Sequence, residues 1–397
     1  MPNTYTYVAT CLFGLEKFVG EEIDALGYKR IETIDGRVTF EGDINAIARC
    51  NIWLRTAEHL YIKVGDTPAY TFSDLFDGVK AMPWEEWIGC DDAFPVKGHS
   101  IQSLLTSIPD CQSIIKKAVC VRLGEEYGLN VLPEEGPKHQ IEFFIFKDKA
   151  TLMIDTSGAP LYKRGYRNET GLAPLRETLA AAMAKISRPR EDVLFWDPMA
   201  GSGTIPIEAA MIMTNTAPGL RRSFAAEQFD DIPQKIFTEA RDEALSSICH
   251  DSAFEAYASD IDPEMVKVAR ENVRRAGMSG CVRVFERDAL TIDTMGRRGT
   301  IVTNSPYGER LLDLKTAREL YRQMGQSFAN LGKWQIYILT SDEEFQRFYG
   351  KRADKVKRLY NGMIKCGLYQ FFKNDDKKPP FAFDNKNKPY QKYKKDR

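Results

Sequence analysis

Val193–Trp196 is followed by Asp197-Pro198-Met199-Ala200-Gly201-Ser202-Gly203-Thr204 and then by the apolar stretch Ile205–Met213. This order predicts a buried strand, a glycine turn and a helix. Glycines let the backbone turn tightly and approach a bound molecule closely. The N-terminus of the following helix favours anionic or hydrogen-bond-accepting groups. The stretch therefore predicts a ligand site where the strand ends and the helix begins.

Two common kinds of glycine turn do not match this one. An ATP-binding P-loop requires Gly-Lys-Ser/Thr, and no lysine stands in the turn. The dinucleotide fingerprint requires a third glycine, and Pro206 occupies that position. We therefore expect an adenosine-type ligand such as S-adenosylmethionine, with S-adenosylhomocysteine as its product. The expected contacts in the turn are Asp197, Pro198, Ala200, Gly201, Ser202, Gly203 and Thr204.

Strands and helices alternate through the second half of the chain. Strand-like runs lie at 256–259, 282–286, 300–303, 335–339 and 367–372, and a helical pattern spans 263–276. This alternation predicts an α/β domain with a Rossmann-like, doubly wound sheet. Ligands of such sheets bind beyond the carboxyl ends of the strands, where polar residues follow these runs.

Carboxylates follow the next two strands after the glycine turn. Asp260 can accept hydrogen bonds from both ribose hydroxyls of an adenosine, and Asp288 can accept from its adenine amino group. We expect Ile261 and Ala289, which adjoin these carboxylates, to contact the cofactor as well. Asp262 is expected to cap the following helix instead.

The ribose carboxylate usually lies roughly 20 residues after the glycine loop. In this chain Asp260 lies much further along. Residues 214–250 are therefore predicted to form an insertion, helical in character.

Asn304-Ser305-Pro306-Tyr307 follows the strand at 300–303 and is predicted to be catalytic. The exocyclic amine of a nucleic-acid base is a poor nucleophile, because its lone pair is delocalised into the ring. The Asn304 amide oxygen and the Ser305 carbonyl can accept its two N–H bonds, while Tyr307 stacks on the base. Positioning and electrostatics then carry the reaction, and no strong general base is required.

The first part of the chain has an α+β pattern. In the first 65 residues, strands predicted at 5–9, 38–40 and 60–64 alternate with helices predicted at 15–26 and 44–55. A helix at 70–81, a strand at 93–97, a long helix at 100–124 and a hairpin of 141–146 with 150–155 follow. The basic and aromatic stretch Leu161–Arg167 is predicted to link this part to the α/β domain.

Composition restricts the class of protein further. No apolar run approaches the roughly 18 residues of a membrane span, and the N-terminus lacks a signal-peptide pattern, so we expect a cytoplasmic protein. The eight cysteines form no C-x-x-C pair, and we expect no metal. The net charge is −1, but Lys373–Arg397 carries nine Lys or Arg against four Asp. Such a tail either binds phosphates or stays a solvated end.

Taken together, these motifs resemble the THUMP-domain family of class I S-adenosylmethionine-dependent RNA methyltransferases. Within it they resemble most the bacterial 23S rRNA guanine-N2 methyltransferases, often labelled N6-adenine-specific DNA methylases. Phe94–Ser100 resembles the THUMP core, Leu161–Arg167 the junction, and Ala173–Ala180 the helix beside the cofactor. The later motifs, at 197–204, 260–263, 288 and 304–310, resemble those of the methyltransferase domain.

The resemblance implies three regions, which we place at 1–65 (ferredoxin-like), 66–165 (THUMP RNA-binding domain) and 166–375 (class I methyltransferase domain). Composition adds a basic tail at 376–397, which is expected to be disordered. The resemblance also implies that Thr178 contacts the cofactor and that the substrate is RNA, most of all large-subunit rRNA, methylated at guanine N2. Candidate phosphate contacts are Lys97, Lys116, Lys117, Arg122, Lys163, Arg164 and Arg167. Adenine N6 in RNA or DNA, and a non-catalytic RNA-binding protein, stay open alternatives, and the oligomeric state is not indicated.

Ser305 departs from the family pattern, which is usually Asn-Pro-Pro-Tyr. Proline would fix φ at this position and hold its carbonyl toward the amine. Serine can reach the same geometry at some entropic cost. We therefore expect slower or equal chemistry, and not its loss.

Overall fold

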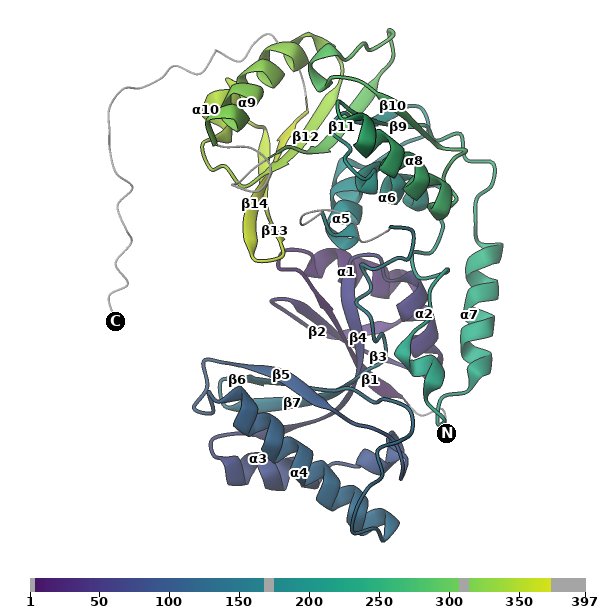
Figure 1. Cartoon of the computed structure of the whole chain (residues 1–397), viewed down its shortest axis with the longest axis vertical. Coiled ribbons are helices and arrows are strands. Elements are labelled where there is room, and N and C mark those ends of the chain that lie inside the picture. The colour runs from purple at the N-terminus through teal and green to yellow at the C-terminus, as the bar shows by residue number, and fades with distance from the viewer. Residues whose placement is uncertain (1–3, 168–174, 307–313, 373–397) are drawn as a thin grey trace, which may run out of the picture.

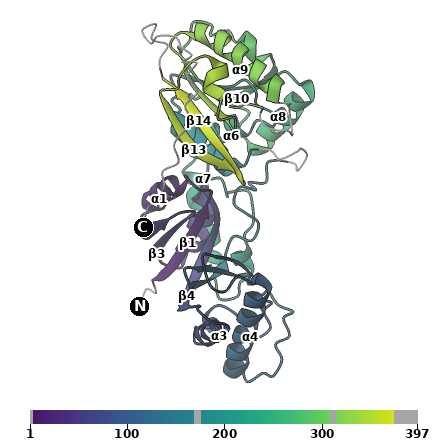
Figure 2. The ribbon, with the colours of Figure 1, turned by 90° about the vertical axis from the view of Figure 1, so that its left-hand side faces the viewer.

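A computed structural model describes residues 4–167, 175–306 and 314–372. Their strands form two seven-stranded sheets, one in the N-terminal part and one in the C-terminal part. Figure 1 shows these two parts stacked along the long axis of the molecule, and Figure 2 shows the same arrangement from the side.

The N-terminal sheet is continuous across two α+β regions, because the 12-residue strand β4 pairs with β1 on one side and with β7 on the other. The strand order is β2-β3-β1-β4-β7-β6-β5. The strands are β1 (Tyr5–Cys11), β2 (Lys29–Ile34), β3 (Arg37–Gly42), β4 (Ala57–Pro68), β5 (Val96–Ile101), β6 (Ile141–Phe146) and β7 (Lys149–Asp155). The helices are α1 (Glu16–Ala25), α2 (Asn45–Trp53), α3 (Phe72–Lys80), η1 (Trp84–Glu86) and α4 (Ile108–Tyr127).

One helix boundary in this region differs from the expectation. The predicted helix at 100–124 begins only at Ile108, because Ser100 and Ile101 belong to β5 and pair with β6. Pro109 then stands at the start of α4, where its missing N–H is no loss. The predicted division between residues 65 and 66 falls within β4, and the domain boundaries stay predictions.

The C-terminal sheet confirms the α/β prediction and is mixed. Its order is β10-β9-β8-β11-β12-β14-β13, and the first five of these strands are parallel. The strands are β8 (Leu194–Asp197), β9 (Ala256–Asp260), β10 (Val282–Glu286), β11 (Gly299–Asn304), β12 (Gln335–Thr340), β13 (Lys355–Asn361) and β14 (Ile364–Phe371). The antiparallel hairpin β13–β14 closes one edge.

Helices cover both faces of this sheet. Residues of α5 (Glu177–Ser187), α6 (Thr204–Met213) and α8 (Pro263–Ala276) pack in one apolar cluster, and residues of α9 (Leu314–Phe328) and α10 (Phe345–Tyr349) pack in another. The short helices η3 (Ala289–Thr291) and η4 (Ala329–Leu331) join the same domain. The chain runs from β8 outward to β10 and then returns to β11 on the other side of β8. The strand order therefore reverses between β8 and β11, where open α/β sheets bind their ligands.

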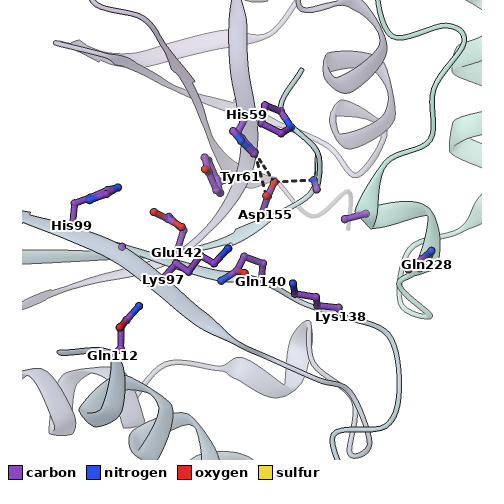
Figure 3. A pocket seen from close by; sticks show the side chains of 14 residues that line it. His59, Tyr61, Lys97, His99, Gln112, Lys138, Gln140, Glu142, Asp155 and Gln228 are labelled. Carbon is purple, nitrogen blue, oxygen red and sulfur yellow. Dashed lines mark hydrogen bonds and ion pairs between the residues drawn. The ribbon is translucent and has the colours of Figure 1, made fainter. Parts of the chain in front are cut away.

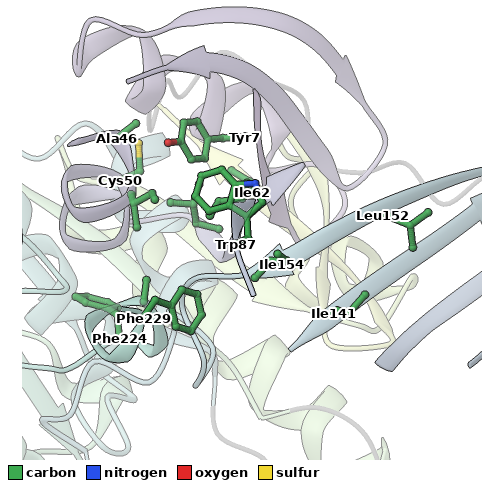
Figure 4. Packing of buried hydrophobic residues seen from close by; sticks show 14 of the residues in the cluster. Tyr7, Ala46, Cys50, Ile62, Trp87, Ile141, Leu152, Ile154, Phe224 and Phe229 are labelled. Carbon is green, nitrogen blue, oxygen red and sulfur yellow. The ribbon is translucent and has the colours of Figure 1, made fainter. Parts of the chain in front are cut away.

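The predicted insertion is helical and packs on the N-terminal region. It contains η2 (Ala225–Gln228) and α7 (Gln234–Ser246), and α7 lies beside α2, as Figure 1 shows. Phe224 and Phe229 are buried in one apolar cluster with Ile62 and Trp87 of the N-terminal region (Figure 4). Burying large aromatic surfaces contributes strongly to association, so the insertion ties the two parts together.

Candidate functional site

The carboxyl ends of β8 and β11 form the floor of the candidate site. Asp197 ends β8, and Asn304 ends the neighbouring strand β11. Both residues lie at the carboxyl ends of their strands, as the sequence predicted, and the strand order reverses between these two strands.

The glycine turn after β8 is held open for a ligand. Gly201 has φ +50°, and a Cβ added there would meet no atom within 4 Å. Gly203 caps α6 with φ +80°, and a Cβ there would lie 3.3 Å from the Cβ of Ala269 in α8. A side chain at either position would be strained, and glycine leaves room above the turn.

Asp260 links the glycine turn to β9. Its Oδ2 accepts from the Gly201 N–H over 2.8 Å, and its Oδ1 accepts from the Asp262 N–H over 3.1 Å. Each carboxylate oxygen keeps a further lone pair. Asp262 caps α8 by accepting from the Glu264 N–H over 2.8 Å, so its predicted capping role is confirmed.

An exposed apolar side chain and a second carboxylate lie beside Asp260. Ile261 is 66% exposed, although it follows a buried strand. Asp288 follows β10, and its Oδ1 caps η3 by accepting from the Leu290 N–H over 2.9 Å. Ala289 is buried beneath it. Because β10, β9 and β8 are adjacent and parallel, Asp197, Asp260 and Asp288 lie along one edge of the sheet.

Asp197 is buried, with 1% of its surface exposed. Burial raises its pKa to about 7, although the hydrogen bond from the Met199 N–H opposes that shift. Pro198 behind it is also buried. The carboxylate can therefore change charge near neutral pH, next to the expected cofactor.

Asn304 presents an unused acceptor. Its Oδ1 is buried and has no hydrogen-bond partner among the described residues. Ser305 is fully buried, and its N–H and hydroxyl both donate to the Leu339 carbonyl of β12. The Pro306 carbonyl accepts from the Tyr321 hydroxyl over 2.9 Å. The two residues that follow Asn304 are thus held by hydrogen bonds to β12 and α9. Tyr307 lies outside the described residues.

Thr178 and Thr204 have partners of their own. The Thr178 hydroxyl donates to Glu58 of β4 over 2.5 Å, and Arg176 bonds the other oxygen of that carboxylate over 2.5 Å. The Thr204 hydroxyl lies 3.0 Å from the Ser202 hydroxyl and accepts from Arg167 over 3.2 Å. Thr204 and Ser202 therefore join the glycine turn, whereas the Thr178 hydroxyl faces the N-terminal region.

The sequence analysis did not identify Glu177 as part of the site. It also did not predict that arginines of the Leu161–Arg167 junction form buried contacts within the protein. Arg167 lies 3.4 Å from Glu177, whose pKa burial raises to about 7. Arg164 is 3% exposed and donates to the main-chain oxygens of Leu161 and Arg55. The prediction that Arg164 contacts phosphate is therefore wrong, because its guanidinium is used inside the protein.

Other candidate phosphate contacts include two ion-paired side chains and an exposed lysine. Lys116 pairs with Glu134 over 2.5 Å, and Arg122 pairs with Glu85. Lys97 is exposed on β5 and lines a pocket.

This pocket has a volume of about 730 Å³ and lies on the N-terminal sheet (Figure 3). His59 Nδ1 lies 3.1 Å from Asp155 Oδ2, and the His59 ring stacks on Tyr61 at 5.6 Å between centroids. Lys97 and Lys138 add exposed positive charge. The pocket therefore offers stacking, hydrogen-bonding and cationic groups together.

The described residues contain no group of three or more His, Cys, Asp or Glu side chains placed to hold a metal ion. None of the described helices is both long enough and apolar enough to cross a membrane.

The donor and acceptor set fits S-adenosylmethionine. The ribose hydroxyls and amino groups of this cofactor donate hydrogen bonds, which carboxylate oxygens can accept. Its sulfonium is positively charged and is attracted by carboxylates. Asp197, Asp260 and Asp288 supply carboxylates, the space above Gly201 admits close approach, and Ile261 offers an apolar surface for an adenine ring.

Three parts of the chain match known protein families. Residues 164–370 match the RMKL-like methyltransferase domain, residues 6–61 the RlmL ferredoxin-like domain, and residues 69–155 the THUMP domain. These matches confirm the family that the sequence motifs resembled.

Similar proteins agree with these domain matches. The Bacillus subtilis (strain 168) protein named "Putative RNA methyltransferase YpsC" is 41% identical over 370 residues, which cover 93% of this chain and 96% of that protein. Ribosomal RNA large subunit methyltransferase K/L of Methylococcus capsulatus is 32% identical over 94% of this chain, which spans only 52% of that protein.

A solved structure gives the cofactor. The crystal structure of SMU.472 complexed with SAH is 42% identical, with a TM-score of 0.88, and the match covers 94% of this chain and 99% of that one. It bears out the expectation of S-adenosylmethionine as the cofactor. The chain thus belongs to the RMKL-like methyltransferase family, with a ferredoxin-like and a THUMP domain before its catalytic domain.

Proposed function

We propose that this protein transfers a methyl group from S-adenosylmethionine to an exocyclic base amine in RNA, at guanine N2 of large-subunit ribosomal RNA. The observation that carries the proposal is the buried Oδ1 of Asn304 at the reversal of strand order, which has no hydrogen-bond partner within residues 4–167, 175–306 and 314–372. A buried acceptor without a partner is costly, so a donor from a bound molecule is expected there. An exocyclic amine is such a donor.

The residues around Asn304 perform positioning. S-adenosylmethionine, when bound, supplies an electrophilic methyl group on a positive sulfur. Asn304 Oδ1 accepts an N–H of the amine and directs its nitrogen toward that methyl group, and the Ser305 carbonyl is proposed to accept the other N–H. The ties to Leu339 and Tyr321 hold these acceptors rigid, which lowers the entropic cost of alignment. Tyr307 is proposed to stack on the base.

The cofactor contacts are proposed to come from the glycine turn and the strand ends. Asp260 would bind the ribose hydroxyls through its free lone pairs, and Ile261 would cover one face of the adenine. Asp288 and Ala289 would bind the adenine edge, and the turn at 197–204 would surround the amino acid part. Thr178 is still proposed to affect cofactor binding. Because its hydroxyl donates to Glu58, we propose that it does so by positioning neighbouring residues and not by touching the cofactor.

RNA as the substrate class has two supports. The names of the two curated relatives include RNA or ribosomal RNA, and residues 69–155 match the THUMP domain. The exposed cations Lys97 and Lys138 line a pocket next to this domain and are proposed to contact RNA phosphates, although Asp155 and Glu142 line the same pocket.

Methyl transfer from labelled S-adenosylmethionine to undermodified ribosomal RNA, with nucleoside analysis, tests the proposal. We expect N2-methylguanosine from the unaltered protein and a loss of at least about 100-fold in rate from Asn304→Ala. N6-methyladenosine would keep the reaction and replace the base. No transfer to RNA or DNA by a protein that binds the cofactor would overturn the proposed activity.

A further inference from the structure

A second large pocket lies between α1 and the methyltransferase domain, toward the end of the sheet opposite to the strand ends that carry Asn304. Its volume is about 680 Å³. Gln335, where β12 begins, lines it, whereas the proposed catalytic residues lie where β12 ends. At about 3.3 Å per residue, Gln335 is roughly 13 Å from Leu339, the register partner of Asn304, and Tyr337, which also lines the pocket, is roughly 7 Å from Leu339. Of the residues that the structure describes, none lines both the pocket and the proposed methyl-transfer site.

Three further elements, besides β12, enclose this basic pocket. The end of α5 forms one wall, α1 a second, and the hairpin β13–β14 a third. The hairpin packs against the N-terminal region, where the Phe13 and Tyr360 rings lie 5.9 Å apart and Lys357 lies 4.8 Å above the Phe18 ring. The side chains that line it include Lys17, Glu21, Lys185, Arg188, Arg190, Gln335, Tyr337, Lys355, Lys357 and Gln370.

The charge of the lining is strongly unbalanced. Its cations are Lys17, Lys185, Arg188, Arg190, Lys355 and Lys357, and its one carboxylate is Glu21. Lys17 pairs with Glu21 at 3.6 Å, and Lys185 pairs with Glu22 outside the lining at 2.7 Å.

The four remaining cations form no ion pair with a carboxylate within the described parts of the chain. Arg188 is the C-cap of α5, and Arg190 follows it two residues later. Lys355 and Lys357 are two residues apart in β13, so their side chains point to the same face of that strand. Lys355 and Lys17 lower the pKa of Lys357, after the larger effect of burial. Cations that outnumber the carboxylates around them in this way favour an anionic ligand.

A buried hydrogen-bond donor in the lining points to the same ligand. Gln370 is 3% exposed, and its amide Nε2 has no hydrogen-bond partner among the described residues. It lies between Tyr337 and Lys355, its register partners on β12 and β13. Buried donors are satisfied in nearly all native structures, so an acceptor from a bound molecule is expected here.

We propose that the basic pocket binds phosphate groups, namely those of an RNA strand whose target base occupies the site at Asn304. Arginine forks and lysine ammonium groups are the usual partners of phosphate oxygens, and the Gln370 amide supplies a neutral donor beside them. The claim that the phosphates belong to RNA rests on the proposed function. The claim that the pocket binds phosphate groups does not depend on it. A free polyphosphate is the other source with the same chemistry.

Salt dependence of RNA binding tests the pocket. The protein with Arg190→Ala and Lys355→Ala together would be titrated against a fluorescein-labelled single-stranded RNA at several salt concentrations. We expect about tenfold weaker binding, and a slope of log K against log salt that falls by about 0.7 for each phosphate that the variant no longer neutralises. The matched control is Lys235→Ala, a lysine of α7 that is 81% exposed and far from the lining; it should leave the slope unchanged.

Inorganic tripolyphosphate distinguishes the two sources. If the double variant loses calorimetric binding of tripolyphosphate but keeps the RNA slope, the ligand is a free polyphosphate and the anion site stands. If neither RNA slope nor tripolyphosphate binding changes, the proposal is overturned. Because tripolyphosphate binding needs no methyl transfer, this arm stays informative if the proposed activity fails.

Gln370→Leu separates ligand binding from structure. Leucine removes an unsatisfied buried donor, so the melting temperature should stay the same or rise, while affinity for RNA or tripolyphosphate should fall several-fold. A purely structural glutamine would give a lower melting temperature and unchanged affinity, which would remove Gln370 from the site. If this variant does not fold, the double variant still decides the proposal.

Discussion

The N–H and the hydroxyl of Ser305 donate to one acceptor, the Leu339 carbonyl, over 3.2 and 3.0 Å. Ser305 follows the proposed catalytic Asn304, and Leu339 lies near the end of the neighbouring strand. The usual family residue at this position, proline, has no N–H to donate. Serine therefore fixes the turn with hydrogen bonds to the next strand, where proline would fix it through its ring.

Ser305→Ala should remove only the hydroxyl bond. We expect the free energy of unfolding to fall by about 1 kcal/mol and the turnover number to fall several-fold, because the carbonyl after Asn304 is held less tightly. Urea unfolding and steady-state methyl transfer would measure the two effects. Ser113→Ala is the matched control, since the Ser113 hydroxyl also donates to a main-chain carbonyl but lies on α4. An unchanged turnover number in Ser305→Ala would show that the hydroxyl does not position the reacting groups.

Asp260→Ala should weaken cofactor binding at least tenfold. The change removes the acceptor that holds the Gly201 N–H, and it removes the proposed partner of the ribose hydroxyls. Calorimetry with S-adenosylmethionine would give the affinity. Asp262→Ala is the control, because that side chain only caps α8; it should cost about 1 kcal/mol of stability and leave the affinity alone. Equal affinities for Asp260→Ala and the unaltered protein would remove Asp260 from the site.

Local pattern predicted much of the fold and of the candidate site. The strand end at Asn304 and the turn at Gly201 are short-range features, and each was recognised from residue types in sequence. β2 was missed because all six of its residues are exposed, so no alternation of apolar and polar residues marks it. β13 was missed for a similar reason, since only Leu359 among its residues is buried.

Long-range partners could not be predicted from the sequence alone. Glu58 and Thr178 are 120 residues apart in the chain and meet only because the two domains pack together. Nothing near either residue in the sequence indicates the other. The same holds for Gln370, whose unused amide becomes visible only when its neighbours on β12 and β13 are known.

Thr178→Val should separate a cofactor contact from a domain contact. The valine cannot donate to Glu58, and a hydrogen bond to a charged group contributes about 1.5–3 kcal/mol, so we expect a matching loss of stability. Affinity for S-adenosylmethionine should stay within a few-fold if the hydroxyl acts only through Glu58. Thermal unfolding and calorimetry would measure both quantities. A large loss of affinity with unchanged stability would instead place Thr178 at the cofactor.

Cofactor affinity should rise with pH around neutrality. Burial raises the pKa of Asp197 to about 7, so the carboxyl is largely protonated below that pH. S-adenosylmethionine carries a positive sulfonium, which attracts the ionised form. Binding therefore favours loss of the proton, and the affinity should increase from about pH 6 and level off above about pH 8, by up to tenfold per pH unit.

The same raised pKa has an opposite effect on the cofactor-free protein. Between the unfolded value near 4 and about 7, the folded state holds more protons than the unfolded state, so the free energy of unfolding falls as pH rises. Asp197→Asn keeps an acceptor for the Met199 N–H and should flatten the affinity profile. It should remove only part of the stability slope, because burial also raises the pKa of Glu177 and of Glu142 to about 7. For the affinity profile the competing group is Glu177, which lies near the glycine turn through Arg167. If Glu177→Gln flattens the affinity profile and Asp197→Asn does not, Glu177 is the titrating group. The cofactor sulfonium then does not interact directly with the Asp197 carboxylate.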